Sequence, residues 1–362
     1  MTALPLDRCS AAFGRAIARL AAAGAALGLL AFVLGLLLGR SGTALAALDA
    51  SFLFFAGLSA GGVALAAAVR VTHGRWARPL LPIADASAGF FAPALAVLAV
   101  LLLGARAFIP WTTASGAGHV AALVLRQLVP TALLFAAGRS FVARARSPSA
   151  DEGRVRTAAV VYLLCYAVVL SFWAFDLVME LSDAPPSTVI PAYYFLGAFL
   201  SGLAWVALVA ALRGTSGPDL RHDVGKLLFA FIVVWSYLLW ALFLPTWYAN
   251  VPEESAQLLR RWHGGYKPFA AFVLVAVFAW PFWLLFSERL KRRRATLAIG
   301  AGTILVGLLA ERFLLVLPSL EVPGGSASWL VGAGVALGVA GLFLLSVGSR
   351  LASIETGDAT AG

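Results

Sequence analysis

Ten long apolar runs dominate the sequence, and each is long enough to cross a membrane. They lie near 16–39, 46–69, 88–110, 119–141, 157–179, 188–212, 225–248, 266–287, 295–317 and 327–349. The hydrocarbon core of a bilayer is about 30 Å thick, and a helix needs roughly 20 apolar residues to span it. Because lipid offers the backbone no hydrogen-bonding partner, each run must form a helix that satisfies its own peptide groups.

Composition and loop length favour the same conclusion. Hydrophobic residues make up 61% of the 362-residue chain and charged residues only 12%, whereas soluble domains contain about 25% charged residues. The longest polar connections, near 142–156 and 249–266, are too short to fold alone. We therefore predict an all-α polytopic membrane protein in which residues 1–362 form one integral membrane domain. The first five spans fall within 15–179 and the second five within 188–350.

The basic residues predict the orientation. If the runs alternate in direction, 20 Lys and Arg side chains lie on the side that holds the N-terminus and 4 lie on the opposite side. Positive charge is retained in cytoplasmic loops, so we expect both termini in the cytoplasm. This loop bias also accounts for the formal net charge of +10, and we expect contact with membrane lipid and none with nucleic acid.

The sequence lacks a ligand set for a resident redox group or metal. Its two cysteines, Cys9 and Cys165, form no CxxC pair, and of its four histidines only His119 borders a predicted span. Haem held between membrane helices needs axial ligands inside spans. No nucleotide-binding loop and no nucleophile–base signature occurs either. We expect this chain to bind no cofactor and not to be catalytic alone.

Ionisable residues inside spans are costly and therefore indicate function. In the first half, these residues fall in the half of the bundle predicted to lie outside. His119 and Arg126 are seven residues apart on one face, about 10 Å along the helix. The full set is Asp49, Arg106, His119, Arg126, Asp176 and Glu180.

Two interpretations of this set stay open. One is a structural ion pair, for instance between Arg126 and Asp176, with Asp49 and Glu180 snorkelling at the membrane surface. The other is a hydrated route from the outer surface toward mid-membrane, suited to passing protons or receiving a head group. In the proton route, Asp176 carries the proton and Arg126 stabilises its charged form.

A second pair, Glu311 and Arg312, lies about 16 residues into the ninth predicted span. Neighbouring helical residues point about 100° apart, so we expect each to have its own partner, with Ser236 and Tyr237 as candidates. Structural and proton-conducting roles stay equally open here.

Aromatic and small residues have structural interpretations. Aromatic side chains near the outer span ends predict an interfacial belt: Trp111, Tyr193, Tyr194, Trp247, Tyr248 and Trp262. Glycines four residues apart, such as Gly24 with Gly28 and Gly57 with Gly61, predict closely packed helices.

Two stretches resemble a known family. The first runs from Lys226 to Glu254 and reads KLLFAFIVVWSYLLWALFLPTWYANVPEE; the second runs from Ser171 to Leu200 and reads SFWAFDLVMELSDAPPSTVIPAYYFLGAFL. Their most specific pieces are AFD at 174–176, GKLLFAF from Gly225, and WYANxPEE at 247–254. A weaker match, ERFLLVLPSL, begins at Glu311. These pieces resemble the NrfD-like ActF subunits of bacterial alternative complex III, a quinol:cytochrome c oxidoreductase.

The resemblance implies a bacterial cytoplasmic membrane and ten helices, arranged as two four-helix bundles plus flanking first and last helices. It also implies three kinds of partner: a paralogous NrfD-like quinol-binding subunit, a periplasmic iron–sulfur subunit and c-type cytochrome subunits. Quinol, haem c and iron–sulfur clusters would then belong to the complex and its other subunits. The family motif corresponds here to Trp247, Tyr248, Asn250, Glu253 and Glu254. Residues 181–188 read LSDAPPST and lack the histidine–aromatic pair expected of the family.

We therefore expect a non-catalytic membrane subunit of a respiratory quinol-oxidising complex that contributes a scaffold and a proton pathway. The proposed proton-pathway residues are Asp176, Arg126, His119, Arg106, Glu311 and Arg312. The alternative is a secondary transporter, whose helices are commonly broken at matching places in two halves. Pro130 and Pro281, in the fourth and eighth predicted spans, match that pattern in part.

Overall fold

The computed structural model describes residues 5–114, 116–147, 149–182, 187–214, 216–262, 264–322 and 325–361. Its helical elements are α1 (Pro5–Leu37), α2 (Ser41–Val71), η1 (Arg75–Leu80), α3 (Leu81–Ala86), η2 (Ser87–Phe90), α4 (Phe91–Leu103), α5 (Ala105–Phe108), α6 (Trp111–Ala114), α7 (Ala117–Ala145), α8 (Glu152–Ala174), η3 (Phe175–Met179), α9 (Ile190–Arg213), α10 (Pro218–Ala249), α11 (Pro252–Trp262), η4 (Gly264–Tyr266), α12 (Lys267–Leu274), η5 (Val275–Ala279), α13 (Trp280–Phe286), α14 (Glu288–Lys291), α15 (Arg294–Val316), η6 (Pro318–Leu320) and α16 (Ser326–Ala361). Elements η3 and η5 are π-helical turns, and the other η elements are 3₁₀ turns.

Ten helical segments in the described part of the chain are long and apolar enough to cross a membrane, and the described residues contain no strand. This confirms the predicted all-α, multi-pass architecture. The third span differs most from its predicted bounds, because it extends over Arg75–Leu103 and includes η1, α3, η2 and α4. Its first half contains Pro79, Pro82 and Asp85, which made that stretch resemble a loop in the sequence.

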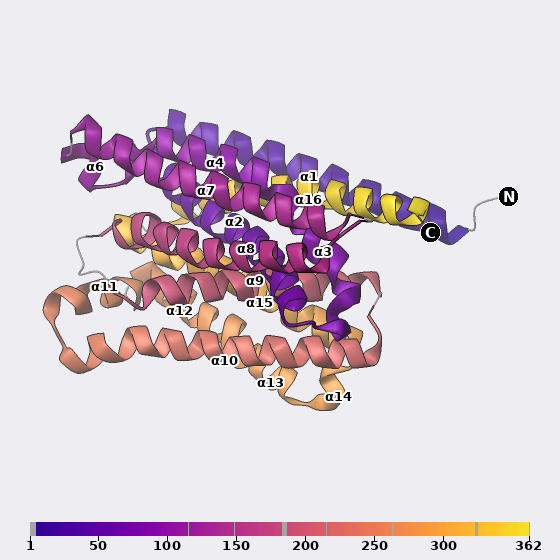
Figure 1. Cartoon of the computed structure of the whole chain (residues 1–362). Coiled ribbons are helices and arrows are strands. Elements are labelled where there is room, and N and C mark those ends of the chain that lie inside the picture. Colours follow the sequence, from indigo (N-terminus) through magenta and orange to yellow (C-terminus); the bar gives the residue numbers. More distant parts are fainter. Residues whose placement is uncertain are drawn as a thin grey trace.

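Both chain ends lie at the same end of the molecule, as an even number of spans requires (Figure 1). We call this end the terminal face. The opposite end, which carries α6 and α11, is the distal face (Figure 1).

The spans form two closed rings of four. In the first bundle, α2 contacts α4 and α8, and α7 contacts both α4 and α8. In the second bundle, α9 contacts α10 and α15, while α13 contacts both α10 and α15. This arrangement matches the two four-helix bundles that the resemblance implied.

Span α2 joins the two bundles. Every residue from 44 to 67 is buried, and α2 packs against α9 and α15 as well as against its own bundle. Small residues make this possible: a Cβ added to Gly61 would lie 2.2 Å from the backbone oxygen of Ala198 on α9. The glycine spacing in this span therefore has the packing role that the sequence predicted.

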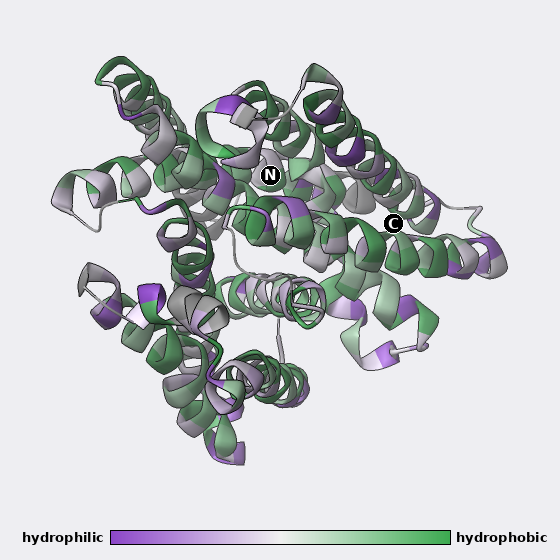
Figure 2. Cartoon of the chain, turned by 90° about the vertical axis from the view of Figure 1, so that its left-hand side faces the viewer, coloured by the Kyte–Doolittle hydropathy of each residue, from purple (hydrophilic) through white to green (hydrophobic). Residues whose placement is uncertain are grey.

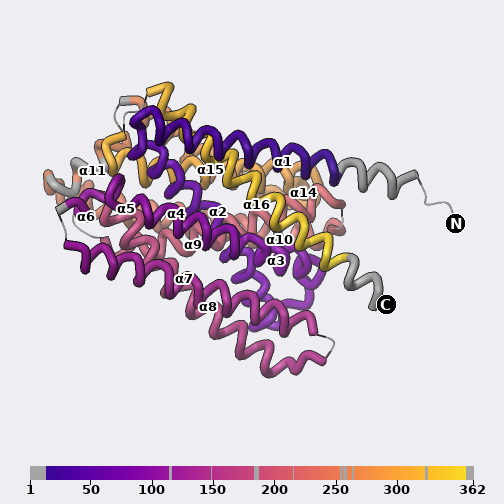
Figure 3. The backbone as a smooth tube through the Cα atoms, turned by 90° about the horizontal axis from the view of Figure 1, so that it is seen from above, coloured from indigo at the N-terminus to yellow at the C-terminus, as the bar shows by residue number. Residues whose placement is uncertain are grey.

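The first and last spans, α1 and α16, pack along each other outside the two rings (Figure 3). Their backbones approach so closely at Gly28 that a Cβ there would lie 2.1 Å from the Cα of Gly338. Hydrophobic residues predominate along the helices (Figure 2), and large apolar side chains are exposed on them. Among them, Leu103, Trp283 and Leu330 are at least 72% exposed, as expected for side chains that face lipid.

Candidate functional site: buried charges and a distal cavity

Arg126 and Asp176 form a two-pronged ion pair between α7 and η3. The Arg126 Nε lies 2.8 Å from Asp176 Oδ2, and Nη2 lies 2.5 Å from Oδ1. Asp176 is buried with 2% exposure, whereas Arg126 is 47% exposed. Asp176 lies in the π-helical turn η3 that follows α8, and such turns frequently occur at functional sites. The ion pair anticipated from the sequence is therefore present.

Two neighbours complete this pair. Gln127 donates hydrogen bonds from Nε2 to Asp176 and to the backbone oxygen of Phe172. Glu180 lies 3.7 Å from Arg126 and is 41% exposed. Burial, together with the nearby Asp176 carboxylate, raises the pKa of Glu180, and Arg126 opposes this shift. Asp176 is thus held by Gln127 on its buried side and by Arg126 on the side of the distal surface.

Glu311 and Arg312 pair with each other, so the expectation that each has its own partner was wrong. Arg312 Nη1 lies 3.1 Å from Glu311 Oε2 and donates to Oε1 at 3.4 Å. Both side chains are long enough to bend toward each other despite diverging at the backbone. The expected partner Tyr237 is instead 66% exposed, and Ser236 hydrogen-bonds to Val233 within α10.

The further contacts of this pair come from α9. The Arg312 guanidinium lies over the Tyr194 ring at 4.4 Å, and its Nη2 donates to the Tyr194 backbone oxygen at 3.4 Å. The Tyr193 hydroxyl lies beside the Glu311 carboxylate. Tyr193 and Tyr194 are 2% and 0% exposed, so their assignment to an interfacial aromatic belt was wrong.

Asp49 is a buried carboxyl that accepts no hydrogen bond from the described residues. It lies two turns inside α2 with 0% exposure, and neither of its oxygens accepts a hydrogen bond from the described residues. The Tyr194 hydroxyl donates to the Leu53 backbone oxygen at 2.8 Å, one turn of α2 away. The snorkelling interpretation of Asp49 is wrong, because the α2 backbone around it is enclosed on all sides.

Three tyrosines continue from this level into the first bundle. Tyr194, Tyr166 and Tyr162 are all buried, and the Tyr162 and Tyr166 ring centroids are 6.5 Å apart. Each hydroxyl donates to a backbone oxygen: that of Leu53, Phe195 or Ala60. The tyrosines therefore supply a polar oxygen at successive depths of an otherwise apolar core.

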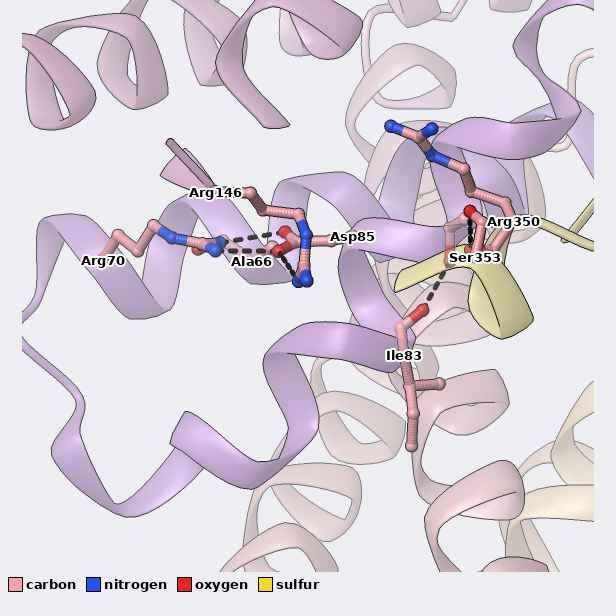
Figure 4. Close-up of polar contacts among 8 residues, drawn as sticks. Ala66, Arg70, Ile83, Asp85, Arg146, Arg350 and Ser353 are labelled. Carbon is pink, nitrogen blue, oxygen red and sulfur yellow. Dashed lines mark hydrogen bonds and ion pairs between the residues drawn. The ribbon is translucent and has the colours of Figure 1, made fainter. Parts of the chain in front are cut away.

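Near the terminal face, Asp85 is fully buried between arginines (Figure 4). Arg70 binds it with both terminal nitrogens, at 3.0 Å and 2.8 Å, while Arg146 lies 3.8 Å away. Arg70 also lies 5.3 Å from the ring of Phe141, which stacks on Tyr162. This cluster connects α2, α3 and the end of α7.

A cavity of about 650 Å³ occupies the distal half of the second bundle. Its wall is mostly aliphatic and aromatic and comes from α9, α10, α11, α12, η5 and α15. Its polar side chains include Glu311, Tyr193, Trp235 and Arg261. Trp235 is 1% exposed, and its indole nitrogen makes no hydrogen bond to any described residue.

The remaining predicted residues do not join these clusters. Arg106 lies on α5, beyond the break at Gly104, and is exposed; His119 is exposed in the first turn of α7. In the family motif, Trp247 and Tyr248 are 62% and 84% exposed at the distal end of α10. Asn250 ends that helix with a positive φ of 48°.

The structure does not describe the side chains of two segments on which the family resemblance bears. Glu253 and Glu254 belong to α11, but their side chains lie outside the described residues. Residues 183–186, within the segment that departs from the family pattern, also lie outside them.

Asp85, Gln127 and Arg261 were missed as site residues. Asp85 falls between the predicted spans 46–69 and 88–110, and Gln127 carries no charge to attract notice, although it directly follows Arg126 in the sequence. Arg261 was counted only as a loop cation. Neither comparison with known proteins identifies the chain, since no family model and no curated protein matches it. A search of the described residues finds no cluster of three or more potential metal ligands.

Proposed function

We propose that this chain is a non-catalytic membrane subunit of a quinol:cytochrome c oxidoreductase of the alternative complex III type, and that it contributes a proton pathway. The complex would lie in a bacterial cytoplasmic membrane with the terminal face toward the cytoplasm. Its partners would be a paralogous NrfD-like quinol-binding subunit, an iron–sulfur subunit and c-type cytochromes. The resemblance of the WYANVPEE segment supports this assembly.

The position of that segment fits contact with a partner. Trp247 and Tyr248 project from the distal end of α10 and contribute little to the core of this chain. A partner subunit seated on the distal face would cover them, as aromatic residues are common at protein interfaces. The same residues would also suit the membrane interface, so the assembly itself needs a direct test.

The main support for the proton pathway is the buried carboxyl of Asp49. A structural ion pair accounts for Asp176 with Arg126, but Asp49 has no cation and no donor among the described side chains. An ionisable group kept inside a membrane domain is by default a functional group. With Asp176 and Glu311 it places carboxyls in the distal half of both bundles, and the buried tyrosines lead from there toward Asp85.

Purification of native membranes under mild detergent tests the assembly. We expect the chain to co-migrate with a multihaem cytochrome c. A chain that migrates alone would contradict its membership of the complex.

Proton release per electron tests the pathway. In the purified complex reconstituted into vesicles, Asp49→Asn and Asp176→Asn should lower proton translocation while leaving electron transfer to cytochrome c intact. Glu180→Gln is the matched control, because this acid lies at the distal surface. An unchanged ratio of protons to electrons in both buried variants would refute the pathway.

A secondary transporter stays the alternative. Span eight is interrupted by the π-helical turn η5 ahead of Pro281, which favours it, whereas Pro130 lies within the continuous helix α7. Pro130 and Pro281 therefore do not mark matching breaks in the two halves. Gradient-driven uptake by vesicles that contain only this chain would support the alternative.

A further inference from the structure

The distal cavity carries polar groups that the contacts within the chain leave unsatisfied. Arg261 Nε and Nη2 and the Trp235 indole nitrogen are buried donors without a hydrogen bond to any described residue. Glu311 Oε2 is a buried acceptor that forms an ion pair with Arg312 Nη1 at 3.1 Å but accepts no hydrogen bond from a described residue. Buried polar groups are nearly always hydrogen-bonded, so four such atoms around one cavity indicate a missing ligand.

Together, these three donors and one acceptor determine which chemical group can bind at the polar end of the cavity. A carboxylate or phosphate would satisfy Arg261 and Trp235 but would be repelled by Glu311. A carbonyl or ether oxygen can only accept hydrogen bonds and would leave Glu311 Oε2 without a hydrogen-bond donor. A hydroxyl does both, because its oxygen accepts from Arg261 or Trp235 while its proton is donated to Glu311.

The volume and lining of the cavity indicate what the rest of the ligand is like. Its volume of about 650 Å³ falls in the range of small-molecule sites, and most of its wall is apolar. Trp240 lines the cavity and is 53% exposed on the outer surface of α10, so the cavity borders the surface that faces lipid. The π-helical turn η5 contributes Phe278 to the wall, and such turns frequently occur at functional sites.

We propose that the distal cavity binds a neutral, hydroxyl-bearing amphiphile from the bilayer, with its hydroxyl between Glu311 and Arg261 and its apolar body among the residues of α10 and α12. The hydroxyl can be phenolic, as in a hydroquinone, or aliphatic, as in a diacylglycerol. This inference does not depend on membership of a respiratory complex. A failed co-purification would leave it standing, and a failed binding experiment would leave the complex standing.

Calorimetric titration of the full chain in lipid nanodiscs tests the head group first. The probes are decylhydroquinone, kept reduced, its dimethyl ether, which has the same ring and chain but no hydroxyl, and dioctanoylglycerol. We expect at least one of the two hydroxyl probes to saturate at one per chain, and we expect the ether to bind at least tenfold more weakly than the tighter hydroxyl probe. Tighter binding of dioctanoylglycerol would identify a glycerolipid as the source, and tighter binding of decylhydroquinone a quinol. Ether binding equal to that of the tighter hydroxyl probe, or no binding of either hydroxyl probe, would overturn the proposal.

Matched variants test the site. Arg261→Met and Trp235→Phe should each weaken the tighter hydroxyl probe at least tenfold. The controls are Arg260→Met, which removes a half-exposed arginine bonded to Glu321, and Trp283→Phe, which alters an exposed tryptophan outside the cavity. Both controls should bind like the unaltered chain. Equal affinities in Arg261→Met and Arg260→Met, with both proteins folded, would refute the assignment of Arg261 to the head-group site.

Discussion

The Asp85 cluster allows a stability prediction whose size follows from its geometry. Asp85 is 0% exposed, and Arg70 binds both of its oxygens at 3.0 Å or less with only 16% exposure. Arg146 lies farther away, at 3.8 Å, and is 21% exposed. Removing one partner of a buried ion pair lowers the free energy of unfolding by about 3–5 kcal/mol, because the other charge is left uncompensated. A long single contact at a wetter position contributes about 1 kcal/mol or less.

We therefore expect Arg70→Gln to lower the free energy of unfolding by about 3 kcal/mol, and a double-mutant cycle with Asp85→Asn to give a coupling of about 2 kcal/mol. The corresponding cycle with Arg146→Gln should give a coupling below about 0.5 kcal/mol. The cycle is needed because Arg146 has further contacts that a single substitution would also remove. Unfolding in bicelles, followed by steric trapping, measures both couplings. Equal couplings for the two arginines would refute the argument from distance and burial.

Three further outcomes are expected. Gly61→Ala should destabilise the chain by about 1–3 kcal/mol, because its Cβ would clash with α9. Gly302→Ala should not destabilise the chain, because a Cβ there meets open space. A greater loss of stability in Gly302→Ala than in Gly61→Ala, measured by denaturant unfolding, would contradict the packing argument. Asp49→Ala should preserve or raise the free energy of unfolding, because the carboxyl loses no hydrogen bond from the described residues; a loss above about 2 kcal/mol would reveal a partner. Burial raises the pKa of Tyr266 to about 12, and its hydroxyl bonds the Val322 backbone. The stability gained from the neutral phenol is complete below pH 10 and is lost as the pH rises through about 12; ultraviolet titration against Tyr266→Phe should find that midpoint and not one near 10.

The spans could be predicted because lipid imposes one rule on the whole chain. Apolar length alone places ten helices, and the pairing of Arg126 with Asp176 follows from placing two opposite charges at the same depth of the membrane. Hydropathy does not report which side of a helix faces its neighbours. Tyr193 and Tyr194 lie near a span end, as belt residues do, yet they face the core.

The departures from the prediction have local causes. The prolines ahead of Asp85 lowered the apolar signal of a stretch that is nevertheless inside the bundle. The two π-helical turns depend on contacts between distant helices and leave no periodic pattern in the sequence. The cavity depends on the exposure and partners of Arg261 and Trp235, which only the folded chain defines.

The close pairing of α1 with α16 has a consequence for biogenesis. During synthesis α1 emerges from the ribosome before the other nine described spans, and its principal neighbour is the last of them. Until then, the backbone around Gly28 would face lipid, which cannot pack against it as closely as the Gly338 backbone does. The outer shell can therefore close only after every span between α1 and α16 has been inserted, and until then the first span lacks its principal packing partner.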